Sequence, residues 1–282
     1  MDTICNIEIA LPRAPELVLD LLAAQGGPLS AQALCRAGAL MDISETAIRV
    51  ALTRLRADQK IDRAERGEYV LNPAGLSLDQ AVRAWRSEPG DEVEWTGQWI
   101  AVHDGAIARA DKTLWRHHQL ALRLRGFSAL APDLHIRPDN RAGSVSSEWR
   151  ALQALGLASK AMVFRLADLD PTSDRRARGL WHAPQLLKGY RALSEALKAH
   201  QAAWPRLAVP RALRESLLLG RSAIQHLVRD PMLPEAFVAS APRRELARLT
   251  RHYTQQAHAL WQQWLGGESG AAENPLDPRA SA

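Results

Sequence analysis

The sequence predicts an α+β protein of several domains, and three observations support this. Helical runs lead into two short β-prone runs near the N-terminus, strand-like and helical runs alternate in the middle, and three long helical stripes follow. Because each segment has its own apolar periodicity, we expect separate domains at 1–86, 95–168 and 179–265. The last residues, 266–282, are rich in small and charged side chains, and we expect a disordered tail there.

The N-terminal region centres on a helix that begins after Ser44, a residue that favours helix starts. Apolar residues with helical spacing predict one buried stripe, formed by Ile48, Ala51, Leu52 and Leu55. The opposite face is small, hydroxylated and basic, and such a face fits a DNA major groove, where Arg reads guanine and a methyl group contacts thymine. The predicted DNA contacts are Ser44, Thr46, Arg49, Val50, Thr53, Arg54, Arg56, Lys60, Arg63 and Arg66.

The segments around this helix predict a winged helix-turn-helix. Helical runs at Glu16–Leu22 and Ser30–Arg36 precede it, and the β-prone runs Lys60–Arg63 and Glu68–Leu71 follow it around the turn Ala64–Gly67. Three helices, the third with a basic face, and then a hairpin are in the winged-helix order. The alternative is an ordinary amphipathic helix whose charged face is only solvated.

The middle of the chain predicts a ferredoxin-like domain. A short helix at Leu78–Arg86 leads toward it. The domain itself is predicted to have strands at Trp99–His103 and Met162–Leu166, helices at Thr113–Arg125 and Ser147–Leu155, and a hairpin at Phe127–Ile136. This order, β-α-β-β-α-β, buries one sheet face under two helices.

The C-terminal part predicts a helical domain. We interpret Asp168–Arg178 as a linker that contains a solvated basic run. Three apolar stripes with helical spacing follow, separated by breaks at Pro205–Pro210 and Asp230–Pro234.

Composition narrows the class of protein. The 282 residues are 46% hydrophobic and 24% charged, as in globular proteins. The start lacks the pattern of a signal peptide, and no apolar run approaches the roughly 18 residues of a membrane span, so we expect a cytoplasmic protein without a membrane partner. Cys5 and Cys35 are too few for a disulfide framework.

The positive charge lies mostly outside the predicted DNA-binding domain. Residues 1–90 hold 10 basic and 12 acidic residues, a net charge of −2, and the remainder holds 26 and 19, a net charge of +7. All nine tryptophans also lie beyond the predicted hairpin. Phosphate contacts flanking the groove, or an anionic effector, would account for the excess.

Enzyme chemistry is not expected, and neither is a cofactor or a bound metal. The sequence has no P-loop, dinucleotide fingerprint, HExxH or GxSxG motif. His117 and His118 are adjacent on a predicted helix and point in different directions, so we interpret them as surface imidazoles. His200 lies on an apolar stripe, which is typical of a core residue with a hydrogen-bond partner.

Several segments, in order, resemble the PaaX family of transcriptional regulators. They are Ala47–Leu55, Tyr69–Leu71 with Gly75, Trp95–Trp99, Leu124–Pro132, Leu180–Trp181 with Tyr190, and Arg229–Pro234, which resembles the family's DP-x-LP signature. Together they cover about residues 15–265.

The resemblance implies a homodimeric repressor that binds double-stranded operator DNA and controls an aromatic-acid catabolic operon, typically for phenylacetate degradation. It also implies release from DNA by an aryl-CoA thioester such as phenylacetyl-CoA. Arg221 and Arg229, near the Asp-Pro-Met-Leu-Pro run, are our candidates for effector phosphate contacts, and solvated surface arginines are the alternative.

A second functional class follows from the same resemblance, because the central fold is similar to that of CRISPR-associated nucleases. Those enzymes place a metal-binding aspartate after the first strand, where this chain has Asp104. The alternative function is therefore a metal-dependent nuclease. An aspartate in a simple turn before Gly105 is the plainer interpretation.

Overall fold

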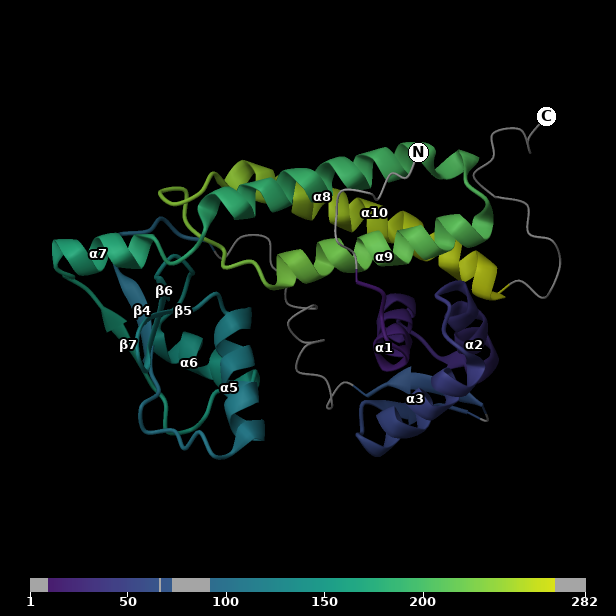
Figure 1. Ribbon diagram of the computed structural model, residues 1–282, viewed down its shortest axis with the longest axis horizontal. Coiled ribbons are helices and arrows are strands. Elements are labelled where there is room, and N and C mark those ends of the chain that lie inside the picture. Colours follow the sequence, from purple (N-terminus) through teal and green to yellow (C-terminus); the bar gives the residue numbers. More distant parts are fainter. Residues whose placement is uncertain (1–9, 66, 73–91, 267–282) are drawn as a thin grey trace. The chain divides into compact units, whose positions relative to one another are not determined.

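The computed structural model describes residues 10–65, 67–72 and 92–266 of this mixed α/β protein (Figure 1). Contacts divide the chain into two compact units: the first comprises 1–79, 191–224 and 245–282, and the second comprises 80–190 and 225–244. We expected 179–265 to form a third domain, but its helices contribute residues to both units. The apolar stripes predicted those helices correctly and carried no information about which segments they pack against.

The N-terminal part of the first unit consists of three helices and a three-stranded antiparallel sheet in the order β1-β3-β2. Its elements are α1 Ala14–Gln25, β1 Leu29–Ser30, α2 Ala31–Leu40, α3 Glu45–Ala57, β2 Ile61–Arg63 and β3 Glu68–Leu71. In the sheet, Leu29 pairs with Tyr69, and Ile61 pairs with Leu71. The apolar stripes of the three helices meet in a common core.

Three long helices follow later in the chain. They are α8 Ala183–Ala203, α9 Val209–Val228 and α10 Ser240–Gly266, with the short 3-10 helix η2 Trp204–Arg206 after α8. Within the first unit, Trp204 stacks on Tyr253, and the Tyr253 hydroxyl lies 2.7 Å from Nδ1 of the buried His200. His200 is therefore a core residue with a polar partner, as its place on the apolar stripe predicted.

The second unit is built on a four-stranded antiparallel sheet in the order β5-β6-β4-β7. Its elements are β4 Trp99–His103, α5 Lys112–Leu124, β5 Ser128–Ala131, β6 Leu134–Pro138, α6 Val145–Ala154 and β7 Met162–Leu166. One face of the sheet packs against α5 and α6 through a core that includes Ile100, Val102, Leu122 and Leu152 (Figure 1).

The other face of this sheet is also partly covered. Trp99 lies in an aromatic cluster with Trp95, Trp181 and Phe237, and its ring stacks on Trp181 with a centroid distance of 6.1 Å. The segments before and after the βαββαβ run thus fold back on the sheet. We expected helices to cover one face of the sheet only. The order of strands and helices gives no information about the flanking aromatic residues, which cover part of the other face.

The predicted linker Asp168–Arg178 is wrong over most of its length, because residues Pro171–Arg178 form helix α7. The Asp170 carboxylate accepts hydrogen bonds from the backbone N–H groups of Thr172 and Ser173, and Pro171 occupies the first turn. An Asp-Pro pair of this kind starts a helix. Arg175 and Arg176 are exposed on it, whereas Arg178 lies over the Trp95 ring, 4.8 Å from the ring centroid.

Several expectations fall outside the described residues, among them the helix at Leu78–Arg86 and all of the tail 266–282 except Gly266, which ends α10. Across the described part of the chain, no helix is both long and apolar enough to cross a membrane.

Candidate nucleic-acid interface

Helix α3 packs against α2 through the side chain of Ile48, which lies close to the backbone of Gly38. The Ser44 hydroxyl accepts a hydrogen bond of 3.2 Å from the Ala47 backbone N–H and so caps the start of α3. A Cβ atom added to Gly38 would lie 2.8 Å from Cγ1 of the fully buried Ile48. Since real Cβ atoms are not found at such a distance, glycine at this position sets the spacing of the two helices.

The opposite face of α3 is exposed over its whole length. Val50 is 61% exposed, which is unusual for a large apolar side chain in the middle of a helix. The other exposed residues among the predicted DNA contacts on this helix and its cap are Ser44, Thr46, Arg49, Thr53, Arg54 and Arg56. This face therefore offers hydroxyl, methyl and guanidinium groups that make few contacts within the chain.

Arg49, the residue predicted to read a base, has an intrahelical partner. Its Nε donates to the Glu45 carboxylate at 2.8 Å, and both side chains are 61% exposed. This hydrogen bond raises the pKa of Arg49 above its ordinary value. An exposed pair of this kind is weak, so a stronger anion such as a phosphate can compete for the guanidinium.

The hairpin carries fewer of the predicted contacts. Arg63 is exposed on β2, Lys60 is half-buried, and Arg66 lies outside the described residues. The hairpin turn closes with the Ala64 backbone N–H donating to the Glu68 carbonyl.

Two arginines that sequence analysis missed hold α2 and the turn that precedes α3. Nη1 of Arg214, on α9, donates to the Leu40 carbonyl at 2.9 Å and pairs with Asp42 at 2.6 Å. Nη2 of Arg36, on α2, donates to the Leu265 carbonyl near the end of α10 at 3.0 Å. No local signal could have revealed these contacts, because the partners lie far apart in the sequence.

Arg221, a predicted effector contact, has another role in the structure. Its guanidinium forms ion pairs with Asp20 and, at 2.8 Å, with Glu16, so it connects α9 to α1. Arg229, the other candidate, is exposed directly after α9 and belongs to the second unit. The structure therefore does not assign the two arginines to one site.

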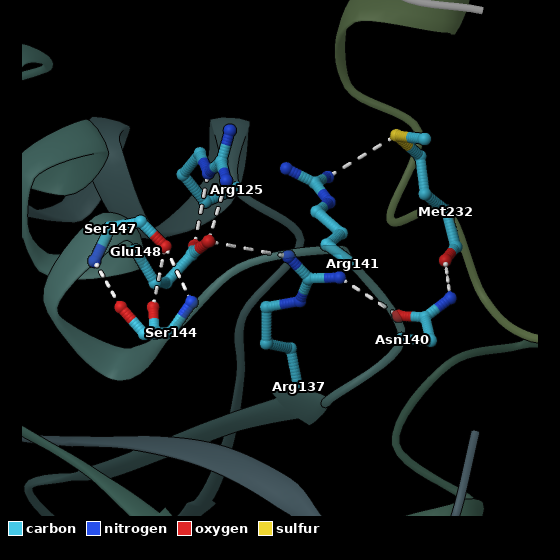
Figure 2. Close-up of polar contacts among 8 residues, drawn as sticks. All are labelled: Arg125, Arg137, Asn140, Arg141, Ser144, Ser147, Glu148 and Met232. Atoms are coloured by element: carbon cyan, nitrogen blue, oxygen red, sulfur yellow. Dashed lines mark hydrogen bonds and ion pairs between the residues drawn. The ribbon is translucent and has the colours of Figure 1, made fainter. Parts of the chain in front are cut away.

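In the second unit, a buried carboxylate contacts two arginines, and a third arginine lies nearby (Figure 2). Glu148 accepts from Arg125 at 3.0 Å, and its other oxygen lies 3.8 Å from Arg137. Arg137 is only 1% exposed and also donates to Asn140 at 2.9 Å. Burial lowers the pKa of Arg137 to about 10, and the Glu148 charge opposes that shift. Burial alone would raise the pKa of Glu148, but the hydrogen bond from Arg125 and the charges of Arg137, Arg125 and, least, Arg141 outweigh it, so the pKa is lowered.

The same network reaches the Asp-Pro-Met-Leu-Pro run. Asn140 donates to the Met232 carbonyl at 2.8 Å, and the Met232 backbone N–H donates to Asp230 at 2.7 Å (Figure 2 shows the first of these contacts). Asp230 is buried, and burial raises its pKa to about 6 against the opposing effect of the nearby Tyr190 hydroxyl. This run is thus a structural connection to the sheet of the second unit.

Asp104, the residue of the nuclease alternative, lies inside the core with an exposed fraction of 1%. Its Oδ2 is 3.0 Å from Nε2 of His118 and 3.5 Å from Nδ1 of His135. Because Nδ1 of His118 accepts the Ala158 backbone N–H at 3.3 Å, Nε2 carries the proton and donates to Asp104. The interpretation of His118 as a surface imidazole was wrong, since its side chain is fully buried.

No set of three or more His, Cys, Asp or Glu side chains within the described segments could hold a metal ion. The carboxylate of Asp104 is instead used in a buried hydrogen bond, and burial lowers the pKa of the neighbouring His135.

Comparison with known proteins places the chain by fold only. No protein-family model matches it, and no curated protein matches it. Among solved structures, it is similar to the uncharacterized protein Rv0674 from Mycobacterium tuberculosis, with 20% sequence identity and a TM-score of 0.54 over 89% of this chain and 99% of that chain. The likeness extends over nearly all of both chains and concerns the fold alone.

Proposed function

We propose that the chain is a DNA-binding transcriptional regulator in which residues 14–71 form a winged helix-turn-helix. The observation that carries the proposal is the outward face of α3, which is exposed and basic while the opposite face is fully buried. The element order α1-β1-α2-α3-β2-β3 supports it, because winged-helix domains have the same order. In this proposal α3 enters the major groove and the β2–β3 hairpin lies beside it.

The chemistry of the face determines what each side chain does in the groove. In this proposal the exposed Arg49 exchanges Glu45 for a guanine edge, to which it donates two hydrogen bonds, and the exposed methyl groups of Val50 contact the methyl group of thymine. Arg54 and Arg56, which flank this centre, are suited to phosphate contacts. Arg63 provides a further positive charge on the hairpin.

The second unit supports a ferredoxin-like assignment for residues 95–168. Its sheet order, β5-β6-β4-β7, and the two helices on one face are those of a β-α-β-β-α-β domain of this kind. We further propose membership of the PaaX family and repression of an aromatic-acid catabolic operon. The support is the ordered series of motifs in the sequence, from Ala47–Leu55 to Arg229–Pro234.

The DNA-binding proposal is tested by retention of promoter fragments from the protein's own locus, measured across a range of salt concentrations. Arg49→Ala should weaken operator binding by roughly 1–3 kcal/mol and leave binding to random DNA nearly unchanged. The matched control is Arg248→Ala, since Arg248 is 62% exposed and also pairs with a glutamate on its own helix. If the protein retains no such fragment at low salt, the DNA-binding proposal is wrong.

The effector part of the proposal is that an acyl-CoA thioester of an aromatic acid releases the protein from DNA. The net charge of +7 outside residues 1–90 supports an anionic ligand. Arg229 stays a candidate phosphate contact because it is exposed, whereas Arg221 is engaged with two carboxylates of α1. Release requires the ligand to prefer the conformation that does not bind DNA.

A panel of acyl-CoA thioesters and their free acids tests the effector. Tryptophan fluorescence reports binding, and operator retention reports release. A thioester preference of about 100-fold between the two conformations gives a clear response. If a thioester binds and operator affinity stays the same, the effector proposal is wrong and the DNA-binding proposal still stands.

A further inference from the structure

Arg137, near the end of β6, shares its carboxylate partner with another arginine. Its side chain is 1% exposed, and its Nη1 lies 3.8 Å from the carboxylate of Glu148. Arg125 already binds that carboxylate through both Nε and Nη2. A buried charge without a close partner is costly. Arg137 therefore has reason to bind a further anion.

The Nε–Nη2 edge of Arg137 is only half used. Nη2 donates to Oδ1 of Asn140 at 2.9 Å, whereas the buried Nε has no acceptor among the described residues. The two N–H groups of this edge point the same way and match two oxygens of a carboxylate or phosphate. Arg125 binds Glu148 through the same edge (Figure 2). One oxyanion would satisfy both groups of Arg137.

Positive charge exceeds negative charge around this edge. The charges of three arginines act on the carboxylate of Glu148: Arg125, Arg137 and Arg141. Asp230 is a second buried carboxylate, and the charge of Arg141 acts on it as well. Asp139 leaves this balance unchanged, because it pairs with the exposed Arg165 at 2.8 Å. Three positive charges thus face two negative ones, and a bound anion would balance the remainder.

Met232 lies on the other side of this group of residues from Glu148 (Figure 2). Its carbonyl accepts from Nδ2 of Asn140 at 2.8 Å, and its sulfur accepts from Nη2 of Arg141 at 3.3 Å. A thioether sulfur is a weak acceptor, so an oxyanion would bind the same guanidinium more strongly. Met232 is half-buried, whereas Asn140 is buried. Solvent therefore reaches the group from the side of Met232.

We propose that Arg137 and Arg141 form a binding site for a small phosphate-type oxyanion, either a free phosphate ion or the phosphate group of a small molecule. The anion accepts from the Nε–Nη2 edge of Arg137 and takes the place of the Met232 sulfur on Arg141. A backbone phosphate of duplex DNA does not reach Arg137, because that side chain is 1% exposed. The site goes beyond the proposed DNA-binding function and does not depend on it.

Titration of the full chain with inorganic phosphate, without DNA, tests the site. Phosphate at a concentration roughly 100-fold above its Kd should raise the Tm by about 5 °C, and sodium chloride of equal ionic strength should not. In protein labelled with ¹⁵N at arginine, phosphate should shift the Nε–H signal of Arg137. AMP and adenosine distinguish the two sources. Tighter binding of AMP than of phosphate, with no binding of adenosine, indicates a phosphate group carried by a small molecule, and tighter binding of phosphate indicates the free ion.

Two variants test the proposed contacts. Arg141→Gln should weaken phosphate binding by at least about 10-fold, because it removes a charge-assisted hydrogen bond. Arg137→Lys keeps the charge and loses the two-pronged edge, so it should weaken binding as well. Arg165→Gln is the matched control, since Arg165 is 44% exposed on the same sheet and also pairs with a carboxylate, and it should bind phosphate like the wild type. Because Arg141 is only half-buried, Arg141→Gln keeps the test valid if Arg137→Lys does not fold.

Three results overturn the proposal. Equal stabilisation by phosphate and by chloride means that only ionic strength acts. Equal phosphate affinity in the wild type and Arg141→Gln means that the ion binds elsewhere. An Arg137 signal that does not move at saturating phosphate means that water is the acceptor for its Nε–H. Each of these results concerns the anion alone and leaves the DNA-binding proposal standing.

Discussion

The guanidinium of Arg214 on α9 lies 2.6 Å from the carboxylate of Asp42, in the turn between α2 and α3. Asp42 has a φ of 58°, so the turn uses a left-handed residue, and the same guanidinium also binds the Leu40 carbonyl. A single side chain from a distant helix therefore holds the start and the middle of the short turn that precedes α3. The position of the proposed DNA-binding helix depends on the helical part of the first unit.

Arg214→Ala should reduce operator affinity through the position of α3, since Arg214 is not among the proposed DNA contacts. We expect a decrease of about 1 kcal/mol in the free energy of unfolding, because the Asp42 partner is largely exposed. Fluorescence anisotropy with operator DNA and urea unfolding measure the two effects. Arg214→Lys should recover part of the affinity, and Arg248→Ala should have no effect. Equal loss in Arg214→Ala and Arg248→Ala would show a general charge effect only.

Glu45→Gln should strengthen DNA binding. The carboxylate of Glu45 lies on the exposed side of α3 and accepts the Arg49 hydrogen bond, so its removal frees the guanidinium and removes a negative charge that faces the phosphates. The cost is a slightly weaker helix, by about 0.3–0.5 kcal/mol, from loss of the intrahelical pair. Retention on operator and random DNA at several salt concentrations measures the gain. Weaker binding to operator would mean that Glu45 itself accepts from a base.

The sequence was sufficient for the local geometry of α3. Its apolar stripe, Ile48, Ala51, Leu52 and Leu55, is buried, and its cap Ser44 binds the first turn. The reason is physical: helical periodicity and side-chain capping act within a few residues. Strand β4 at Trp99–His103 likewise has the bounds that its β-branched and aromatic pattern predicted.

Contacts between distant segments could not be predicted. The sequence made Arg221 a candidate for an effector phosphate contact. In the structure it forms an ion pair with Glu16, a residue 205 positions away in the sequence. His118 was assigned to the surface because it and its neighbour His117 point in different directions on one predicted helix, whereas Asp104 provides the partner that makes its burial favourable. Both assignments depend on which elements pack together, and periodicity does not contain that information.

Glu148→Gln should strongly destabilise the second unit. The carboxylate neutralises the fully buried Arg137 and binds Arg125, and a buried charge that loses its partner costs about 3–5 kcal/mol. Thermal and urea unfolding measure the loss. The control is Asp139→Asn, which removes the partner of Arg165, a side chain that is 44% exposed, and should cost less than about 1 kcal/mol. Similar losses in the two variants would mean that Arg137 is solvated in solution.

Asp230→Asn should change how stability depends on pH. Burial raises the pKa of Asp230 to about 6, above its ordinary value of 3.8, so the folded chain binds the proton more tightly than the unfolded chain. The stabilising effect of that proton is complete below about pH 3.8 and is lost as the pH rises through 6. The asparagine has no charge to bury and keeps an oxygen that accepts the Met232 N–H. The variant should therefore gain stability relative to wild type as the pH rises from 4 to 7, by roughly 2–3 kcal/mol.

Urea unfolding of wild type and Asp230→Asn at matched protein concentration and several pH values gives this difference directly. Glu245→Gln is a control of opposite sign, because hydrogen bonds from Arg248 and Lys198 lower the pKa of Glu245 to about 2. The stabilising contribution of that carboxylate is present above the ordinary pKa of 4.5 and is lost as the pH falls toward 2. A difference between wild type and Asp230→Asn that stays constant from pH 4 to 7 would show that Asp230 does not titrate in this range, and that its environment is open to water.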